Sequence, residues 1–249
     1  MKPRFFIFVP LLIGFLLAIA IPQLSNGDRR DKHYKAEREK MVATQMDWHT
    51  VRAGRIGVKD KRVLEAMRRV LRHEFVPDSQ KSHAYSDSPL PIGYDQTISQ
   101  PYIVAYMTEL LKPKKEHKVL EVGTGSGYQA AVLAELVHHV YTIEIIKELS
   151  ESAKKRLKHL DYENVTVRFG DGYYGWEEHA PYDAIVITAA PDHIPPPLVQ
   201  QLKPGGVMCI PVGGRFQIQN LTLVQKTADG SIKTKQMMPV RFVPLTGKH

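Results

Sequence analysis

Apolar and polar positions along residues 118–249 form blocks that predict strands and helices in turn. "KVLEVG" and "YDAIVITAA" are short apolar runs typical of buried strands, whereas "YQAAVLAELV" and "KELSESAKKRLKHL" have helical spacing. Strands that alternate with helices predict a mostly parallel sheet with helices on both faces. Two later runs, "IQNLTLVQKT" and "SIKTKQMMPVRFVPL", predict a closing antiparallel pair. We therefore expect an α/β fold whose ligands lie at the carboxyl ends of the strands.

Upstream of this core, amphipathic helices are predicted at residues 34–50 and 60–72. Asp60 is a plausible N-cap of the second helix. One stripe of that helix is apolar: Val63, Leu64, Met67, Val70 and Leu71. Residues 75–93 are dense in Pro, Ser and Asp and predict a loop. Pro101 then suits the first turn of a further helix that runs to about residue 111.

Residues 5–21 form an uncharged, mostly apolar stretch. Its length fits a signal peptide, with "AIA" at 18–20 as the cleavage site, or a short membrane anchor. The downstream flank at residues 29–40 carries six Lys and Arg, more than the two upstream, and positive flanks favour the cytoplasmic side. We expect an anchor in the inner membrane with the folded part in the cytoplasm. The alternative is export, with a signal peptide cleaved near Ala20. In both cases we expect residues 1–27 to lie outside the fold and residues 28–249 to form a single domain.

The basic excess of the chain belongs to its N-terminal third. The formal net charge is +8; residues 1–83 hold 17 Lys and Arg against 9 Asp and Glu, whereas residues 84–249 hold 17 of each. A nucleic-acid groove in the α/β core is therefore disfavoured, and we expect no nucleic-acid partner.

The single cysteine and the histidines argue against a metal site. One cysteine excludes an intramolecular disulfide and a Cys-only cluster, and the apolar neighbours of Cys209 predict a core position. The eleven histidines show no HExxH or paired Cys/His spacing, so we predict no metal.

A glycine-rich turn, "EVGTGSG", links a predicted strand to a predicted helix. Its glycines have GxGxG spacing, and Tyr128 stands where a dinucleotide fingerprint would have its third glycine. Glycines at this spacing let the backbone pass close under a ligand and adopt positive φ. A pyrophosphate needs the helix N-terminus aimed at it, whereas a cofactor without phosphates does not. The GxGxG spacing therefore favours S-adenosylmethionine over NAD. The alternative is a turn that only tightens the strand–helix junction.

Two acidic residues end the next predicted strands. Glu144 ends "HVYTIEI", twenty-one residues after Gly123, where a carboxylate can accept both hydroxyls of a ribose. Asp171 is the last residue of "VTVRFGD", and Gly172 follows it. Both are in place to hydrogen-bond an adenine amino group or its surroundings.

The chain resembles the protein-L-isoaspartate O-methyltransferase family in five segments: "LPIGYDQTISQPYIVAYMTELL", "VLEVGTGSGYQAAVLAELV", "GDGYYGWEEHAPYDAIVITAAP", "LKPGGVMCIPVG" and "VRFVPLT". They come in the family's order and cover roughly residues 35–246. The polar segment that begins at residue 90 is the specific element, because the glycine turn alone would fit many methyltransferases. The resemblance implies a Rossmann-like methyltransferase sheet of about seven strands, with helices at about 34–83 preceding a core at about 84–249.

The resemblance also implies an activity. The enzyme would transfer a methyl group from S-adenosyl-L-methionine to the α-carboxyl of L-isoaspartyl residues in damaged proteins and so initiate their repair, with D-aspartyl acceptance left open. We expect a monomer. Ser99, in "TISQP", matches the residue that the family assigns as catalytic. The matching cofactor positions are Gln96, Thr97, Ile98, Glu121, Gly123, Thr124, Gly125, Gly127, Glu144, Asp171, Gly172 and Thr246.

The inferred chemistry needs no general base. A carboxylate is already ionised at neutral pH, so the absence of a Ser/His/Asp constellation is expected. We interpret Ser99 as an orienting donor rather than a covalent nucleophile; a second role as the N-cap of the following helix is compatible with this.

The chain departs from the family pattern at Asp95, where many relatives have glycine, at Leu71, which is commonly proline, and in the apolar N-terminus. A carboxylate close to the site would disfavour a carboxylate substrate, unless it points to solvent or pairs with a cation. Two alternative functions follow: a methyltransferase with another substrate, or a membrane-tethered relative that binds the cofactor but has lost catalysis.

Overall fold

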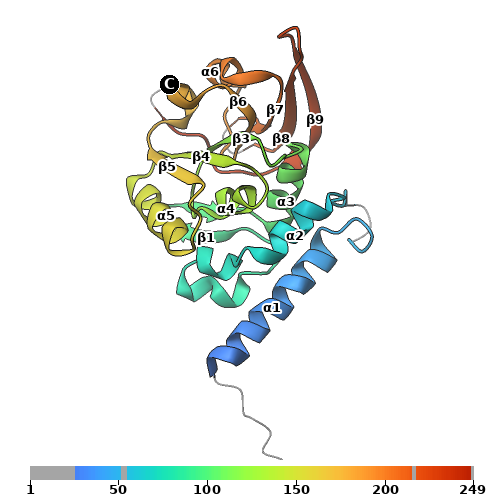
Figure 1. The fold of residues 1–249 in the computed structure, drawn as a ribbon, viewed down its shortest axis with the longest axis vertical. Helices are drawn as coiled ribbons and strands as arrows, with labels where there is room; N and C mark the ends of the chain where they lie inside the picture. Colours follow the sequence, from blue (N-terminus) through green and yellow to red (C-terminus); the bar gives the residue numbers. More distant parts are fainter. Residues whose placement is uncertain (1–25, 52–54, 215–216, 248–249) are drawn as a thin grey trace, which may run out of the picture.

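The computed structural model describes residues 26–51, 55–214 and 217–247 (Figure 1). The apolar stretch at residues 5–21 lies outside the described residues. None of the described helices has both the length and the apolar character needed to span a membrane. The helices are α1 (Asn26–Gln45), α2 (Lys61–Arg69), α3 (Pro101–Leu110), α4 (Tyr128–Ala134), α5 (Lys147–His159) and α6 (Pro196–Gln200). The 3-10 helices are η1 (Arg72–Phe75), η2 (Asp78–His83), η3 (Gly172–Tyr174) and η4 (Glu177–His179).

Seven of the strands form one sheet. These are β3 (Lys118–Val122), β4 (His139–Glu144), β5 (Val165–Phe169), β6 (Tyr182–Ile187), β7 (Leu202–Val212), β8 (Gln219–Lys226) and β9 (Ile232–Val240). Their order is β5-β4-β3-β6-β7-β8-β9, parallel from β5 to β7, with β8 antiparallel to both β7 and β9. The predicted α/β sheet with its closing antiparallel pair is confirmed. The strand order reverses between β3 and β6, where ligands of such sheets bind.

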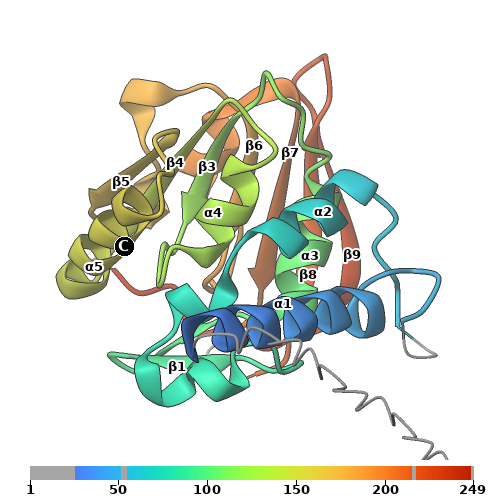
Figure 2. The same ribbon diagram turned by 60° about the horizontal axis from the view of Figure 1, so that its bottom comes forward.

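Both faces of the sheet are covered. Neighbouring residues of a strand point to opposite faces, so Val119 belongs to one apolar cluster and Leu120 to the other. The first cluster contains buried residues of α1 to α5, and the second contains Leu198 of α6. Figure 2 shows α2, α3 and α4 in front of the sheet with α1 crossing below them. The helical region therefore packs against the same face as the helix that follows the glycine turn.

Two predicted helix boundaries are wrong. The helix expected at 34–50 is α1, which begins at Asn26 and ends at Gln45. The helix expected at 60–72 ends at Arg69, since the backbone at Val70 is extended, and Leu71 is 37% exposed rather than on the buried stripe. The chain turns there, which allows the next residues of η1 to face inward. The N-cap prediction is confirmed: the Asp60 carboxylate accepts a hydrogen bond from the Arg62 N–H at 2.9 Å.

The segment predicted as a loop at 75–93 contains regular structure. It includes η2, and its end forms β1 (Leu90–Gly93), which pairs antiparallel with β2 (Gln96–Ile98). Tyr94 and Asp95 both have φ of 55° and form the two-residue turn between these strands. Such a turn requires positive φ at both positions and is normally signalled by Asn-Gly or Asp-Gly, whereas the residues at this turn are Tyr-Asp. The hairpin carries Gln96 to Ile98 toward the ends of the sheet strands.

Candidate active site

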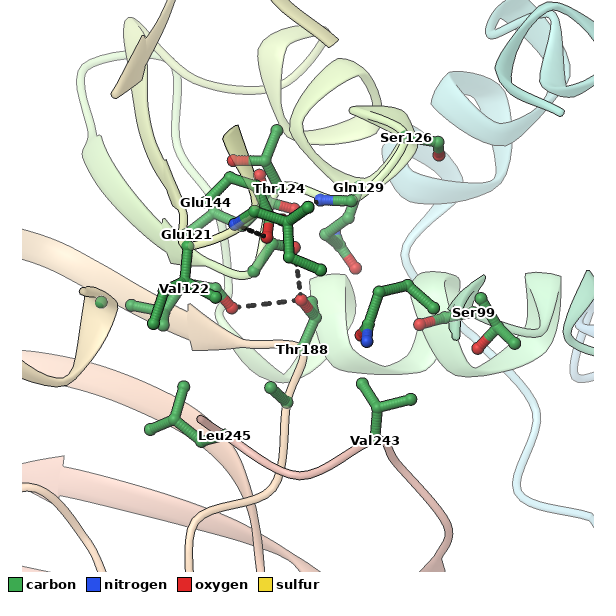
Figure 3. Close-up of a pocket in the computed structure, with 18 of the residues that line it drawn as sticks. Ser99, Glu121, Val122, Thr124, Ser126, Gln129, Glu144, Thr188, Val243 and Leu245 are labelled. Carbon is green, nitrogen blue, oxygen red and sulfur yellow. Dashed lines mark hydrogen bonds between the residues drawn. The ribbon is translucent and has the colours of Figure 1, made fainter. Parts of the chain in front are cut away.

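A pocket of about 770 Å³, counting the part open to solvent, lies at the carboxyl ends of β3, β4 and β6 (Figure 3). Most of the residues predicted as site residues line it: Gln96, Thr97, Ile98, Ser99, Glu121, Gly123, Thr124, Gly125, Glu144, Gly172 and Thr246. The structure thus brings together residues that are up to 150 positions apart in the sequence.

Two predicted residues lie outside this lining. Gly127 occupies the N-cap position of α4 with φ of 89°, and a Cβ there would lie 3.2 Å from Leu157, so it allows helix packing. Asp171 lies at the N-cap of η3, and its carboxylate accepts a hydrogen bond from the Tyr173 N–H at 3.0 Å. A cofactor contact by either residue stays a prediction.

Two glycines of the site, Gly123 and Gly172, pack too closely against their neighbours to carry a side chain. Gly123 has φ of 98°, and a Cβ on it would lie 2.5 Å from Oγ1 of Thr188, whose hydroxyl donates to the Gly123 carbonyl at 2.6 Å. A Cβ on Gly172 would lie 2.4 Å from Val122. Neither position accepts a larger residue without displacement of its neighbours, so glycine is needed for the close packing of the backbone beneath the pocket.

Glu144 joins the end of β4 to the glycine turn. Its carboxylate accepts hydrogen bonds from the N–H groups of Gly125 at 2.7 Å and Ile146 at 3.0 Å. Burial raises the pKa of Glu144, and the two backbone donors oppose that shift. A carboxylate has about four acceptor positions, so Glu144 can accept two further hydrogen bonds from a ligand.

Glu121 is the end of a buried hydrogen-bond chain. The Thr142 hydroxyl, on the neighbouring strand, donates to Oε2 of Glu121 at 2.5 Å and is itself 2.6 Å from Oγ1 of Thr124. The Oε1 atom of Glu121 has no hydrogen-bond partner in the described part of the chain. Burial raises the pKa of Glu121 to about 8. A buried acceptor without a partner at a pocket wall is a place for a hydrogen-bond donor or cation of a ligand.

The hairpin supplies the opposite wall, and Ser99 follows it directly. Helix α3 has Gln100 at its N-cap position without a side-chain hydrogen bond, so the interpretation of Ser99 as the helix cap is wrong. Figure 3 shows Ser99 across the pocket from Glu121, beside the start of α3. The Ser99 carbonyl accepts a hydrogen bond from Arg72 at 2.8 Å.

Asp95 does not line the pocket. Its side chain is exposed at the tip of the hairpin, where its backbone forms the turn. Asp95 thus meets the stated exception: its side chain is exposed to solvent and is not among the lining residues.

Several lining residues were not predicted: Ser126, Gln129, Thr188, Val243 and Leu245. Thr188 directly follows β6, so the rule that ligands bind at strand ends could have indicated it. Val243 and Leu245 reach the pocket because their segment pairs with Ala190, whose N–H donates to the Val243 carbonyl at 2.8 Å. No local sequence pattern predicts the pairing of this segment with Ala190.

A second pocket of about 1100 Å³, also counting open space, adjoins the first. The two share Thr97, Ser99, Thr188 and Val243. Its other walls are mainly apolar and include residues of α3 and β9, with Arg55 and Arg241 as its cations. Arg55 pairs with Asp87 at 2.7 Å, whereas Arg241 has no ion-pair partner among the described residues.

The sequence comparisons agree with one another. The family model of protein-L-isoaspartate(D-aspartate) O-methyltransferase matches residues 45–249. The chain belongs to this family. It is 57% identical over 240 residues to a protein-L-isoaspartate O-methyltransferase 2 of Syntrophobacter fumaroxidans, covering 95% of this chain and 97% of that one. It is 63% identical over 189 residues to a protein of the same name from Polaromonas, covering 76% and 90%.

Solved structures show the same fold. A protein-L-isoaspartate O-methyltransferase superposes with a TM-score of 0.72 at 30% identity, covering 88% of this chain and 66% of that chain. A methyltransferase of Plasmodium falciparum in complex with S-adenosyl-L-homocysteine gives a TM-score of 0.68 at 23% identity, covering 86% and 98%. The sheet is thus the Rossmann-like methyltransferase sheet that the resemblance implied.

Family membership gives the reaction. The enzyme transfers a methyl group from S-adenosyl-L-methionine to isoaspartyl residues of proteins. The first pocket fits this cofactor, since Glu121 offers an unpartnered acceptor and Gly123 and Gly125 border the pocket with backbone alone. Among the residues that the structure describes, no group of three or more His, Cys, Asp or Glu could hold a metal ion.

Proposed function

We propose that the first pocket binds the cofactor, the second binds the isoaspartyl peptide, and the residues they share hold the reacting groups. The observation that carries this is the shared wall: Thr97, Ser99, Thr188 and Val243 border both pockets. A methyl donor in one pocket and an acceptor in the other meet only there.

The cofactor contacts follow from the unused acceptors of the first pocket. Glu144 accepts the ribose hydroxyls, and Oε1 of Glu121 accepts from a donor group or cation of the cofactor. The hairpin and the C-terminal segment cover the cofactor through Gln96, Ile98 and Thr246. When bound, the cofactor supplies an electrophilic methyl group on its sulfonium.

The chain orients and dehydrates the nucleophile. The hydroxyls of Thr97 and Ser99 donate to the substrate carboxylate without a buried fixed charge, so the carboxylate stays ionised and no base is needed. Apolar walls such as Tyr102 and Ile103 exclude water from the second pocket. Orientation and loss of solvent together supply the rate increase.

A matched peptide pair tests this function. An isoaspartyl peptide carries its α-carboxylate one methylene closer to the backbone than an aspartyl peptide carries its side-chain carboxylate. A site built from polar contacts leaves them unpaired with the wrong isomer, so we expect methylation of the isoaspartyl peptide and almost none of its aspartyl twin. A D-aspartyl peptide in the same series determines whether that isomer is accepted. Equal methylation of both peptides would refute this assignment and favour a methyltransferase of another substrate.

We further propose that residues 28–249 form a single monomeric domain, tethered to the inner membrane through residues 5–21 and facing the cytoplasm. The apolar stretch and the six basic residues that follow it support this orientation. Protease added to intact spheroplasts should leave the domain uncut, and detergent should be needed to extract it. A soluble exported protein with a mature N-terminus near Ile21 would support a signal peptide instead. Light scattering of a variant that begins at residue 28 measures its oligomeric state.

A further inference from the structure

A buried arginine lies behind the wall that carries Ser99. Arg72, the first residue of η1, has 0% exposure, and among the described residues no carboxylate pairs with it. Burial lowers its pKa only to about 10, so the side chain is charged at neutral pH. A buried charge without an ion-pair partner has a large desolvation free energy. The hydrogen bonds and ring contact of the Arg72 guanidinium must therefore compensate for its burial.

Those contacts bracket the active-site hairpin. The Nε–H group of Arg72 donates to the carbonyl of Ala84 at 2.7 Å, and an Nη2 hydrogen donates to the carbonyl of Ser99 at 2.8 Å. Residues 85–98 between these carbonyls include β1, β2 and their turn. One planar guanidinium therefore joins the two ends of the segment that forms a pocket wall.

The same guanidinium contacts the other side of the site. Its Cζ atom lies 4.7 Å from the ring centroid of Tyr128, the first residue of α4 after the glycine turn. Tyr128 is one of the residues that line the first pocket and is 1% exposed. Arg72 thus connects the hairpin wall to the helix that begins under the cofactor.

We propose that Arg72 is the positioning residue of this enzyme: its guanidinium fixes the Ser99 backbone relative to the glycine turn. The proposal rests on the assignment of Ser99 and Thr97 to the shared wall. A lysine cannot reproduce the arrangement, because an ammonium lacks the planar set of donors that reaches two carbonyls while its face covers a ring.

Arg72→Lys and Arg72→Gln test the proposal. At saturating cofactor we expect kcat on an isoaspartyl peptide to fall about tenfold to a hundredfold in both variants, as for a misplaced reacting group. The KM for the peptide should change less than kcat. Circular dichroism at the assay temperature must show that both variants are folded.

Tyr182→Phe is the matched control. The Tyr182 hydroxyl is equally buried and donates to the Trp176 carbonyl at 2.6 Å, but Tyr182 lines neither pocket. Its loss should lower Tm and leave kcat unchanged. A wild-type kcat in a folded Arg72→Lys or Arg72→Gln enzyme would overturn the proposal, as would an equal loss of kcat in Tyr182→Phe.

Hydrogen exchange separates this proposal from the assignment of function. In Arg72→Gln the amides of residues 90–99 should exchange about tenfold faster, while Tyr182→Phe should leave them unchanged. This holds even if no isoaspartyl peptide is methylated. Unchanged exchange at 90–99 in Arg72→Gln would show that the guanidinium does not hold the hairpin.

Discussion

Thr142 donates to one oxygen of the Glu121 carboxyl at 2.5 Å, while the other oxygen has no partner among the described residues. The two residues face each other on neighbouring parallel strands, so the contact is built into the register of the sheet. The sheet therefore presents one buried acceptor to the pocket and satisfies the other itself.

This arrangement predicts a pH effect on stability. The pKa of Glu121 is raised from 4.5 to about 8 by burial, so the ligand-free folded protein binds one more proton than the unfolded chain between these values. The contribution to stability is fully present below about pH 4.5 and is lost as pH rises toward 8. Glu121→Gln should reduce this fall in the free energy of unfolding by on the order of 5 kcal/mol, at about 1.4 kcal/mol per pKa unit. Urea unfolding at pH 5 and pH 8 measures it; equal slopes with pH in both proteins would contradict the prediction.

Glu144→Ala should weaken cofactor binding. The change removes the acceptor for the ribose hydroxyls and leaves the Gly125 N–H without its partner, a loss of about 1–3 kcal/mol. Calorimetric titration with S-adenosyl-L-homocysteine gives the affinity, and Glu148→Ala on the exposed first turn of α5 is the control. Unchanged affinity in Glu144→Ala would remove Glu144 from the cofactor site.

Ser99→Ala should lower kcat by about tenfold or more and leave cofactor affinity nearly unchanged. A donor that orients the carboxylate matters most in the transition state, so its loss affects turnover rather than cofactor binding. Steady-state kinetics with a saturating isoaspartyl peptide, together with calorimetry, separate the two quantities. A fully active variant would exclude Ser99 from the mechanism.

Asp95→Gly should stabilise the protein and leave kcat and KM unchanged. Residue 95 has φ of 55°, where an L-residue is disfavoured and glycine is not, so we expect a gain of about 1 kcal/mol. Asp161→Gly, at another exposed aspartate with φ of 60°, should give a similar gain in thermal unfolding. Loss of activity in Asp95→Gly alone would mean that the carboxylate contacts the substrate.

Arg241 should make the enzyme favour acidic residues beside the isoaspartyl residue. Its exposed guanidinium borders the second pocket without an ion-pair partner among the residues described. An exposed ion pair with a peptide glutamate lowers KM by about threefold at low salt relative to glutamine. Arg241→Gln should abolish that difference, whereas Lys233→Gln on β9, outside the pocket, should not. Persistence of the preference in Arg241→Gln would assign it to another group.

Local patterns were sufficient to predict the centre of the site. The glycine turn and the acidic strand end of Glu144 lie within short segments whose alternation of apolar and polar positions indicates where each strand stops. Because parallel strands end at the same edge of the sheet, residues predicted separately had to meet in space.

Non-local contacts could not be predicted in this way. The hairpin turn at Tyr94 and Asp95 has neither Asn-Gly nor Asp-Gly, the usual signals of such a turn, so the sequence predicts a loop there. Arg72 was included in a helix, although its burial depends on carbonyls contributed by Ala84 and Ser99. The place of Val243 is set by its hydrogen bond with Ala190, in the segment that follows β6.

That pairing has a consequence for protein synthesis. Ribosomes make the chain from its N-terminus, and Val243 to Thr246 follow every other residue that lines the first pocket. The nascent chain can form the strands and the glycine turn before this segment emerges, but one wall of the pocket is still missing. The full set of residues that line the first pocket is therefore assembled only at the end of synthesis, when this segment pairs with Ala190.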